Sequence, residues 1–150
     1  RVKSSVSITN PDYLQENDIV IADTAEDETV GKAVQIGKIS IPLVSGLHTI
    51  PCRPNFETAP GFLGYYINSN AYHSQLLPHI TGIKVSSVSK KSIDTTYLHI
   101  PKDIKEQQAI ASVLTEMDDE IDNLECEKEK ILQMKAGAMD ELLTGKVRLV

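Results

Sequence analysis

A long heptad pattern occupies the last third of the chain and most constrains its fold. Residues 103–145 contain no proline and only one internal glycine, Gly137. Apolar residues recur there at alternating spacings of four and three, as at the a and d positions of a heptad repeat: Ile110, Leu114, Met117, Ile121, Leu124, Ile131, Ala138 and Leu142. We predict one helix of about 40 residues, which would be roughly 60 Å long.

This apolar seam requires a covering surface. A helix of that length far exceeds the usual helix of a compact domain, so the chain's own globular part could cover only some of the seam. We predict that a partner helix pairs with it as a coiled coil; the alternative is an amphipathic helix folded back on its own domain. Lys128 and Lys135 occupy two a positions. They either fix the register of the pair or extend their ammonium groups into solvent.

Length and composition set the broad class. The 150 residues suit one domain with an appended helix. No apolar run is long enough to span a bilayer and no secretory signal is evident, so we expect a cytoplasmic protein without a membrane partner. Cys52 and Cys126 are too few for a disulfide framework, which favours a reducing compartment. Because the chain begins at Arg1 rather than methionine, we expect an upstream piece to be missing.

Charge is distributed unevenly along the chain. The net charge of −6 by itself disfavours a nucleic-acid partner. Much of the acid, however, lies between Glu116 and Glu129, on the predicted long helix. Residues 31–91 carry one acid, Glu57, and six bases, a balance of +5; the bases are Lys32, Lys38, Arg53, Lys84, Lys90 and Lys91. This segment is therefore basic although the whole chain is acidic.

The globular part is predicted to be rich in strands. Apolar runs between turn signals predict strands at residues 1–8, 18–23, 32–36, 38–44, 47–53, 83–88 and 95–100, with a turn at 9–12. Two short helices are predicted at 61–68 and 70–80, with these apolar side chains inward: Phe62, Leu63, Tyr66, Ile67, Leu76 and Leu77. The fold class is α+β: a small mixed or antiparallel β-rich domain (residues 1–102), the long coiled-coil helix (103–145) and a tail (146–150).

Several stretches resemble a known family. The C-terminal conserved region of type I restriction–modification specificity subunits is similar to residues 142–148 and to Ile100, Pro101, Glu106, Gln107, Ile110, Leu114, Asp118, Ile121, Leu124 and Lys135. The target-recognition domain of that family is similar to residues 17–21, 31–32, 62–63, 66–69, 81–82 and 89–90. The family domain usually begins with further strands and often a tryptophan, and a full subunit carries two such domains and two such helices. The resemblance therefore implies a C-terminal fragment or a half-subunit.

The resemblance also implies a division of labour. The globular part would read one half of a bipartite site in double-stranded DNA. The long helix would pair antiparallel with that of a second recognition half, or of a second copy. The paired helices would set the spacing of the half-sites and dock the methyltransferase subunits, and through them the restriction subunit. S-adenosylmethionine would belong to the methyltransferase subunits, so we expect this chain to hold no cofactor.

Candidate DNA contacts are polar side chains of the basic segment. Lysine ammonium groups neutralise phosphates, and serine hydroxyls bond phosphates or base edges. One candidate stretch, which fits a solvated strand face equally well, comprises Lys84, Ser86, Ser87, Lys90 and Lys91. Other candidates, expected in a strand pair with the same facing, are Lys38, His48 and Arg53. Arg53, if presented to a major groove, could read guanine through two bonds, but we expect a surface ion pair for it instead.

Other functional patterns are incomplete. Residues 10–13 read Asn-Pro-Asp-Tyr, which differs at its third position from an amino-methyltransferase motif and follows no glycine-rich loop. The acids around residues 18–28 lack nuclease spacing, the four histidines lack metal-ligand spacing, and residues 144–146 lack the first glycine of a phosphate loop. We therefore predict no catalytic or metal-binding residue. The alternative function is a coiled-coil dimerisation or scaffold protein whose globular part binds protein.

Overall fold

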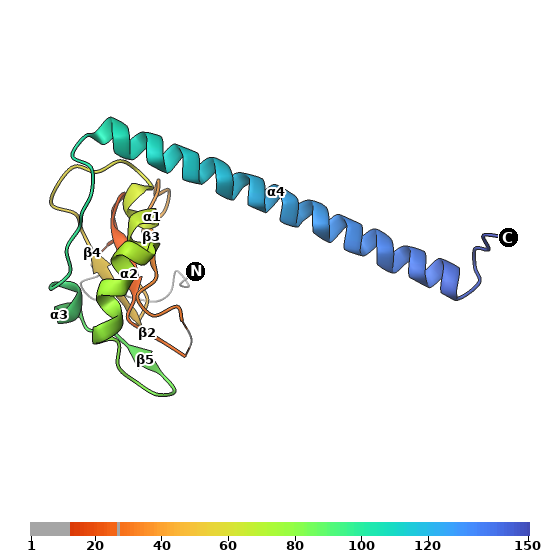
Figure 1. Cartoon of the computed structure of the whole chain (residues 1–150), viewed down its shortest axis with the longest axis horizontal. Coiled ribbons are helices and arrows are strands. Elements are labelled where there is room, and N and C mark those ends of the chain that lie inside the picture. The colour runs from red at the N-terminus through yellow and green to blue at the C-terminus, as the bar shows by residue number, and fades with distance from the viewer. Residues whose placement is uncertain (1–12, 27) are drawn as a thin grey trace. The chain divides into compact units, whose positions relative to one another are not determined.

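A computed structural model describes residues 13–26 and 28–150 (Figure 1). The predicted strand at 1–8 and the predicted turn at 9–12 lie outside the described residues. The chain divides after Ala111 into two compact units. The division falls inside the long helix α4 (Ile104–Leu143), so the first two turns of this helix belong to the globular unit.

A three-stranded antiparallel sheet forms the centre of the globular unit. Strand β1 (Ile19–Ala22) lies between β3 (Ala33–Gln35) and β4 (Thr49–Cys52). Ile19 pairs with Gln35 on one side and Cys52 on the other. The alternation of the strand buries Ile19 and Ile21 on the same face. The strands predicted at 18–23, 32–36 and 47–53 are thus confirmed.

Two short helices supply the other side of the core. Helices α1 (Phe62–Asn68) and α2 (Asn70–Leu76) are followed by the 3-10 turn η1 (Leu77–His79), so both predicted helices are confirmed. They pack with β1 in one apolar cluster that includes Phe62, Leu63, Ile67, Tyr72 and Leu76. Leu77 was predicted to face inward and is exposed, because the α-helix ends at Leu76 and the tighter turn redirects the next side chain.

Side-chain amides close the outer edge of the sheet. The amide of Asn68, the last residue of α1, accepts from the Ala33 N–H at 2.9 Å and donates to the Ala33 carbonyl at 2.7 Å. Gln35 accepts from the Gly64 N–H at 3.0 Å. The two bonds to Ala33 satisfy strand groups that would otherwise lack a neighbouring strand, and all three bonds fix α1 against β3.

A second, smaller sheet includes two residues of the strand that was predicted at 83–88. Only Ser86–Ser87 (β5) forms a strand, antiparallel to β2 (Thr24–Ala25). Most of that predicted strand is therefore wrong. Gly82 adopts a φ of 129°, which a residue with a Cβ would rarely adopt, and the turn that follows leaves Ile83 fully exposed.

Two other predicted strands are wrong within the described chain. Residues 38–44 form only a single bridge, between Val44 and Tyr13. Residues 95–100 form no strand: the first two belong to a turn, and further on the Tyr97 N–H donates to Gln75 and the His99 N–H donates to the Tyr66 hydroxyl. Before them, Lys90–Ile93 forms the short helix α3. Apolar and β-branched residues predicted strands in these segments, but no strand in the part of the chain that the structure describes pairs with them.

The predicted long helix is confirmed. Helix α4 comprises 40 residues, Ile104–Leu143, and its C-terminus is closed by Gly145 at a φ of 73°. Its length corresponds to about 60 Å. Small antiparallel sheets with helices make the fold class α+β, as predicted. Among the described helices, none is both long and apolar enough to cross a membrane.

Candidate nucleic-acid interface and helix seam

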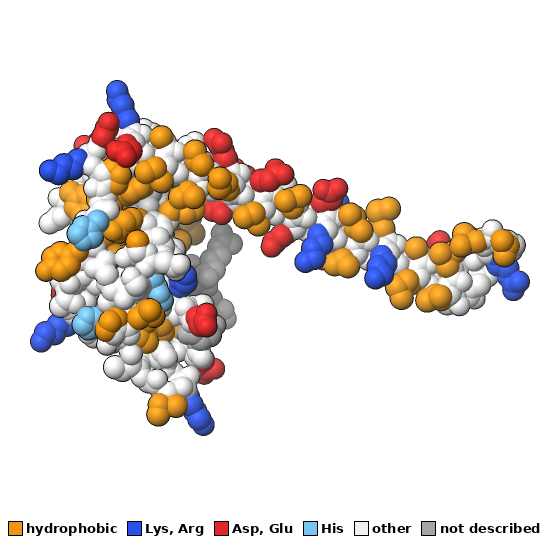
Figure 2. Space-filling view, in the orientation of Figure 1, with side chains coloured by type: hydrophobic (Ala, Val, Ile, Leu, Met, Phe, Trp, Pro, Cys, Tyr) orange, Lys and Arg blue, Asp and Glu red, His pale blue; other side chains and the backbone are white. Residues whose placement is uncertain are grey.

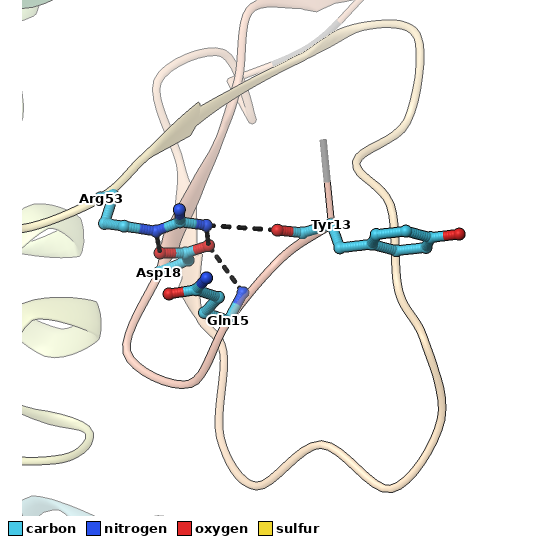
Figure 3. Close-up of polar contacts among 4 residues, drawn as sticks. All are labelled: Tyr13, Gln15, Asp18 and Arg53. Carbon is cyan, nitrogen blue, oxygen red and sulfur yellow. Dashed lines mark hydrogen bonds and ion pairs between the residues drawn. The ribbon is translucent and has the colours of Figure 1, made fainter. Parts of the chain in front are cut away.

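An ion pair holds Arg53, the candidate guanine reader (Figure 3). Its Nε donates to Asp18 Oδ1 and its Nη2 to Asp18 Oδ2, both at 2.8 Å. Nη2 also donates to the Tyr13 carbonyl at 3.2 Å, and the Gln15 N–H donates to Asp18 at 2.7 Å. The Asp18 side chain is 3% exposed and that of Arg53 is 54% exposed. The ion pair expected for Arg53 is therefore present, with its carboxylate buried and not at the surface.

This pair joins the start of β1 to the end of β4. The hydrogen bond from Arg53 holds the pKa of the Asp18 carboxyl below its usual value, and the Gln15 N–H acts in the same direction. Desolvation opposes both effects. The Nε–Nη2 edge of Arg53 is already occupied by a carboxylate in two-bond geometry. In this structure that edge stabilises the sheet and does not present a fork for guanine.

A corner of the globular unit brings together His48, Ser86 and Ser87. The Asp23 N–H donates to the His48 carbonyl at 3.2 Å, and the Val88 N–H donates to the Asp23 carbonyl at 2.8 Å. His48 Nδ1 lies 3.9 Å from Asp23 Oδ1, and Ser87 pairs with Thr24, the residue after Asp23. His48 is exposed, whereas both serines are half-buried. Backbone bonds through Asp23 thus bring these segments to one corner, and the DNA contacts of the three residues stay a prediction.

The four candidate lysines are exposed and lie in separate segments. Lys84 lies in the turn before β5 and lines a groove of about 590 Å³ with Lys32 and two acids, Glu26 and Glu28. Lys90 and Lys91 form the first turn of α3, whose N-cap Ser89 accepts from the Ser92 N–H at 3.1 Å. Lys38 lies in the irregular segment between β3 and β4. The strands predicted at 38–44 and 83–88, which were expected to present Lys38 and Lys84, do not form as predicted. A surface shared by the four lysines would therefore consist of turns and the start of α3.

A second groove, of about 330 Å³, lies beside β4 and residues 93–98. Its lining is mainly apolar, including Leu63, Ile67 and Leu98. Burial raises the pKa of the Cys52 thiol on its wall, so that thiol stays protonated near neutral pH and is a poor nucleophile. Within residues 13–26 and 28–150, no three side chains of His, Cys, Asp or Glu gather as metal ligands do.

Sequence reasoning missed the structural role of Gln107. This side chain is 2% exposed, in the first turn of α4. Its carbonyl oxygen accepts from Thr58 Oγ1 at 3.2 Å and from the Ala59 N–H at 3.0 Å, and its amide donates to the Pro101 carbonyl at 2.7 Å. Gln107 thereby fixes the start of the long helix to the loop before α1. The Glu106-Gln107 pair marked the family resemblance, but periodicity does not predict these partners.

The predicted seam is exposed on α4. Met117, Ile121 and Leu124 are 58%, 52% and 55% exposed. Further along the helix Ile131, Ala138 and Leu142 are exposed as well, whereas Leu114 is half-buried. Figure 2 shows apolar side chains recurring along the helix, with acidic ones between them over its first half. Exposed apolar rows of this kind mark interaction surfaces.

Comparison with known proteins identifies the family. Residues 2–133 match the model of the type I restriction modification DNA specificity domain. A curated relative is the "Putative type I restriction enzyme MjaX specificity subunit" of Methanocaldococcus jannaschii, which is 30% identical over 131 residues. That match covers 83% of this chain and 29% of the relative, so the chain spans under a third of the length of the relative. The chain belongs to the family of type I restriction modification DNA specificity domains.

Proposed function

We propose that this chain reads one half of a bipartite DNA site within a cytoplasmic type I restriction–modification complex. The globular unit would contact double-stranded DNA, and α4 would pair with a second recognition half and dock the methyltransferase subunits. The restriction subunit would join through those subunits. The observation that carries the proposal is a globular unit of the specificity-domain family continuous with a 40-residue helix whose seam is exposed.

The globular unit has properties that suit DNA contact. Its residues 31–91 carry a balance of +5, and the four candidate lysines are exposed. Exposed ammonium groups can neutralise DNA phosphates, and the counterions that are then released favour binding. The pairing of β5 with β2 fixes the strand after Lys84, and the Ser89 N-cap fixes the first turn of α3 that carries Lys90 and Lys91, which favours a defined orientation on the duplex.

The length of α4 suits a spacer. At about 1.5 Å per residue its 40 residues span about 60 Å, whereas half-sites one turn of duplex apart are separated by about 34–36 Å. A pair of such helices could hold two recognition units more than one turn apart. The chain itself would perform no catalysis; the methyl transfer, with S-adenosylmethionine as donor, would take place on the methyltransferase subunits.

Methylation of a duplex library tests this function. The chain, the methyltransferase subunits of its own operon and a second recognition half are combined with S-adenosylmethionine and random-sequence duplexes. Sequencing of the methylated fraction should give a two-part motif. Exchanging residues 13–102 for those of a homologue should change one part and leave the other part and the spacer unchanged. Methylation without sequence preference, or a motif unaffected by the exchange, would refute the proposal.

A scaffold function is the second candidate, and the acidic middle of α4 favours it. Residues 116–127 contain seven acids and no base, which disfavours contact between this segment and DNA. A scaffold would assemble with its protein partners and have no effect on which duplexes become methylated. The library experiment therefore separates the two functions.

A further inference from the structure

Acidic side chains flank the exposed seam of α4. With the seam residues at a and d, positions e and g border it on either side. Between residues 113 and 141 those positions hold no base; they hold five acids, all exposed: Asp118, Glu120, Glu125, Glu127 and Glu141. The other flanking positions are apolar: Val113, Leu132, Met134 and Met139. A helix seated on this seam therefore meets apolar side chains near both ends and negative charge in the middle.

A second copy of this chain would place acids opposite acids. In an antiparallel pair e faces e and g faces g. Alignment about residue 126 sets Glu125 against Glu125 and Glu127 against Glu127 of the second copy. Sliding the copies by one heptad sets Glu120 against either Glu127 or Glu141. Parallel pairing sets Glu120 against Glu125, so each of these registers contains like-charge pairs, which destabilise coiled coils.

The two lysines in the seam do not remove this repulsion. Lys128 and Lys135 lie at a positions, where an ammonium group can reach a flanking acid of a partner. Even if both lysines did so, five acids less two bases would leave a net charge of −3 at the seam and its flanks on each helix. A self-pair would double this excess along one interface.

We propose that the occupant of this seam is a helix of different sequence, with Lys or Arg at the positions that flank its own seam, and not a second copy of this chain. The inference rests on the proposed function, in which the long helix pairs with another recognition half. The inference adds which charges flank the seam of the partner helix. Opposite charges at e and g select a partner and reject a self-pair.

The test uses the full chain and two variants with equal charge change. The flank variant carries Asp118→Lys, Glu120→Lys, Glu125→Lys and Glu127→Lys. The outer variant carries Glu116→Lys, Asp119→Lys, Asp122→Lys and Glu129→Lys, all at b, c or f positions that face away from the seam. Sedimentation at micromolar concentration and low salt should show wild-type protein as a monomer. Wild type mixed with the flank variant should form a 1:1 complex, at least about tenfold tighter than with the outer variant, and weaker as salt rises.

Three results would overturn the inference: a wild-type homodimer as tight as the mixed pair, equal binding by the outer variant, or no mixed complex although circular dichroism shows intact helices. Should the flank variant fail to fold, the neutral variant Asp118→Asn, Glu120→Gln, Glu125→Gln and Glu127→Gln replaces it. That protein should self-associate at least about tenfold more tightly than wild type, and equal association would overturn the inference. No DNA is present, so a wild-type homodimer would leave DNA recognition to be decided by the methylation library.

Discussion

The two parts of helix α4, before and after residue 111, differ in which side chains they bury. In its first two turns a polar side chain, Gln107, is buried with three hydrogen bonds, and Ala111 is buried next to the core. After Ala111, large apolar side chains such as Met117, Ile121 and Leu124 are more than half exposed. The same helix thus buries a polar side chain near its start and exposes apolar side chains along the rest of its length.

This difference separates a completed core from an interface that awaits a partner. A buried amide is tolerated where its nitrogen and its oxygen find hydrogen-bond partners, and both atoms of Gln107 do. An exposed apolar row gains free energy only when another surface covers it. Substitutions in the first part should therefore change the stability of the globular unit, and substitutions in the second part should change assembly.

The largest expected effect is on assembly. Leu114→Lys with Ile121→Lys should weaken binding of the chain to its partner helix by at least about 100-fold, because two ammonium groups would replace apolar seam contacts. Asn123→Lys with Gln133→Lys adds the same charge at outward positions and should bind nearly as wild type does. Sedimentation of the mixed chains measures both. Equal binding by the two double variants would remove the seam from the interface.

Next in size is the loss of the buried amide. Gln107→Leu leaves Thr58, the Ala59 N–H and the Pro101 carbonyl without their partner, and should lower the free energy of unfolding of the globular unit by about 2–4 kcal/mol. Urea denaturation followed by near-ultraviolet circular dichroism of the tyrosines measures this loss. Gln108→Leu, at the exposed neighbouring position, should change stability by less than about 0.5 kcal/mol. A similar loss in both variants would argue against a specific anchor.

A smaller effect is expected on DNA affinity. Lys84→Glu, Lys90→Glu and Lys91→Glu together should reduce the affinity of the assembled complex for DNA by about tenfold or more and make binding less dependent on salt. Lys102→Glu, Lys105→Glu and Lys130→Glu give the same change in net charge at other exposed positions. Fluorescence anisotropy over a salt series compares the two triple variants. Equal losses would mean that net charge matters and the proposed surface does not.

The smallest effect concerns Arg53 and depends on pH. Arg53 lowers the pKa of Asp18 in the folded protein, so the pair stabilises the fold above the unfolded-state pKa of about 3.9. That stabilisation is lost as pH falls through the lower folded-state pKa. Arg53→Gln should cost about 1 kcal/mol at pH 7, a figure reduced for the half-exposed arginine, and progressively less in acid. Urea titrations at several pH values measure this, with Arg148→Gln as the control; a pH-independent difference would contradict it.

The predictions that the structure confirms were based on periodic patterns of apolar residues. Helix α4 follows from its heptads, α1 and α2 from their apolar spacing, and β1 from a short apolar run. Each of these signals is local, because the same residues that mark the element also form its buried or pairing face. The family resemblance added the expectation of DNA recognition, which spacing alone does not provide.

The missing parts depend on contacts between distant residues. Residues 95–100 have the apolar content of a strand, yet their backbone bonds to Gln75 and Tyr66. Asp18, the ion-pair partner of Arg53, lies 35 residues away, and two of the partners of Gln107 lie 48 and 49 residues away. No local pattern identifies such pairs. The prediction that Lys84, Ser86 and Ser87 share a face assumed a strand at 83–88. A turn after Gly82 replaces most of that strand, and no local pattern indicated the turn.

Hydrogen exchange of α4, measured by mass spectrometry in the free chain and in the assembled complex, tests the central distinction most directly. We predict that assembly slows exchange across residues 112–143 and leaves the core helices of residues 62–76 nearly unchanged. Unchanged exchange across residues 112–143 on assembly would contradict the account, because the exposed seam would then have gained no partner.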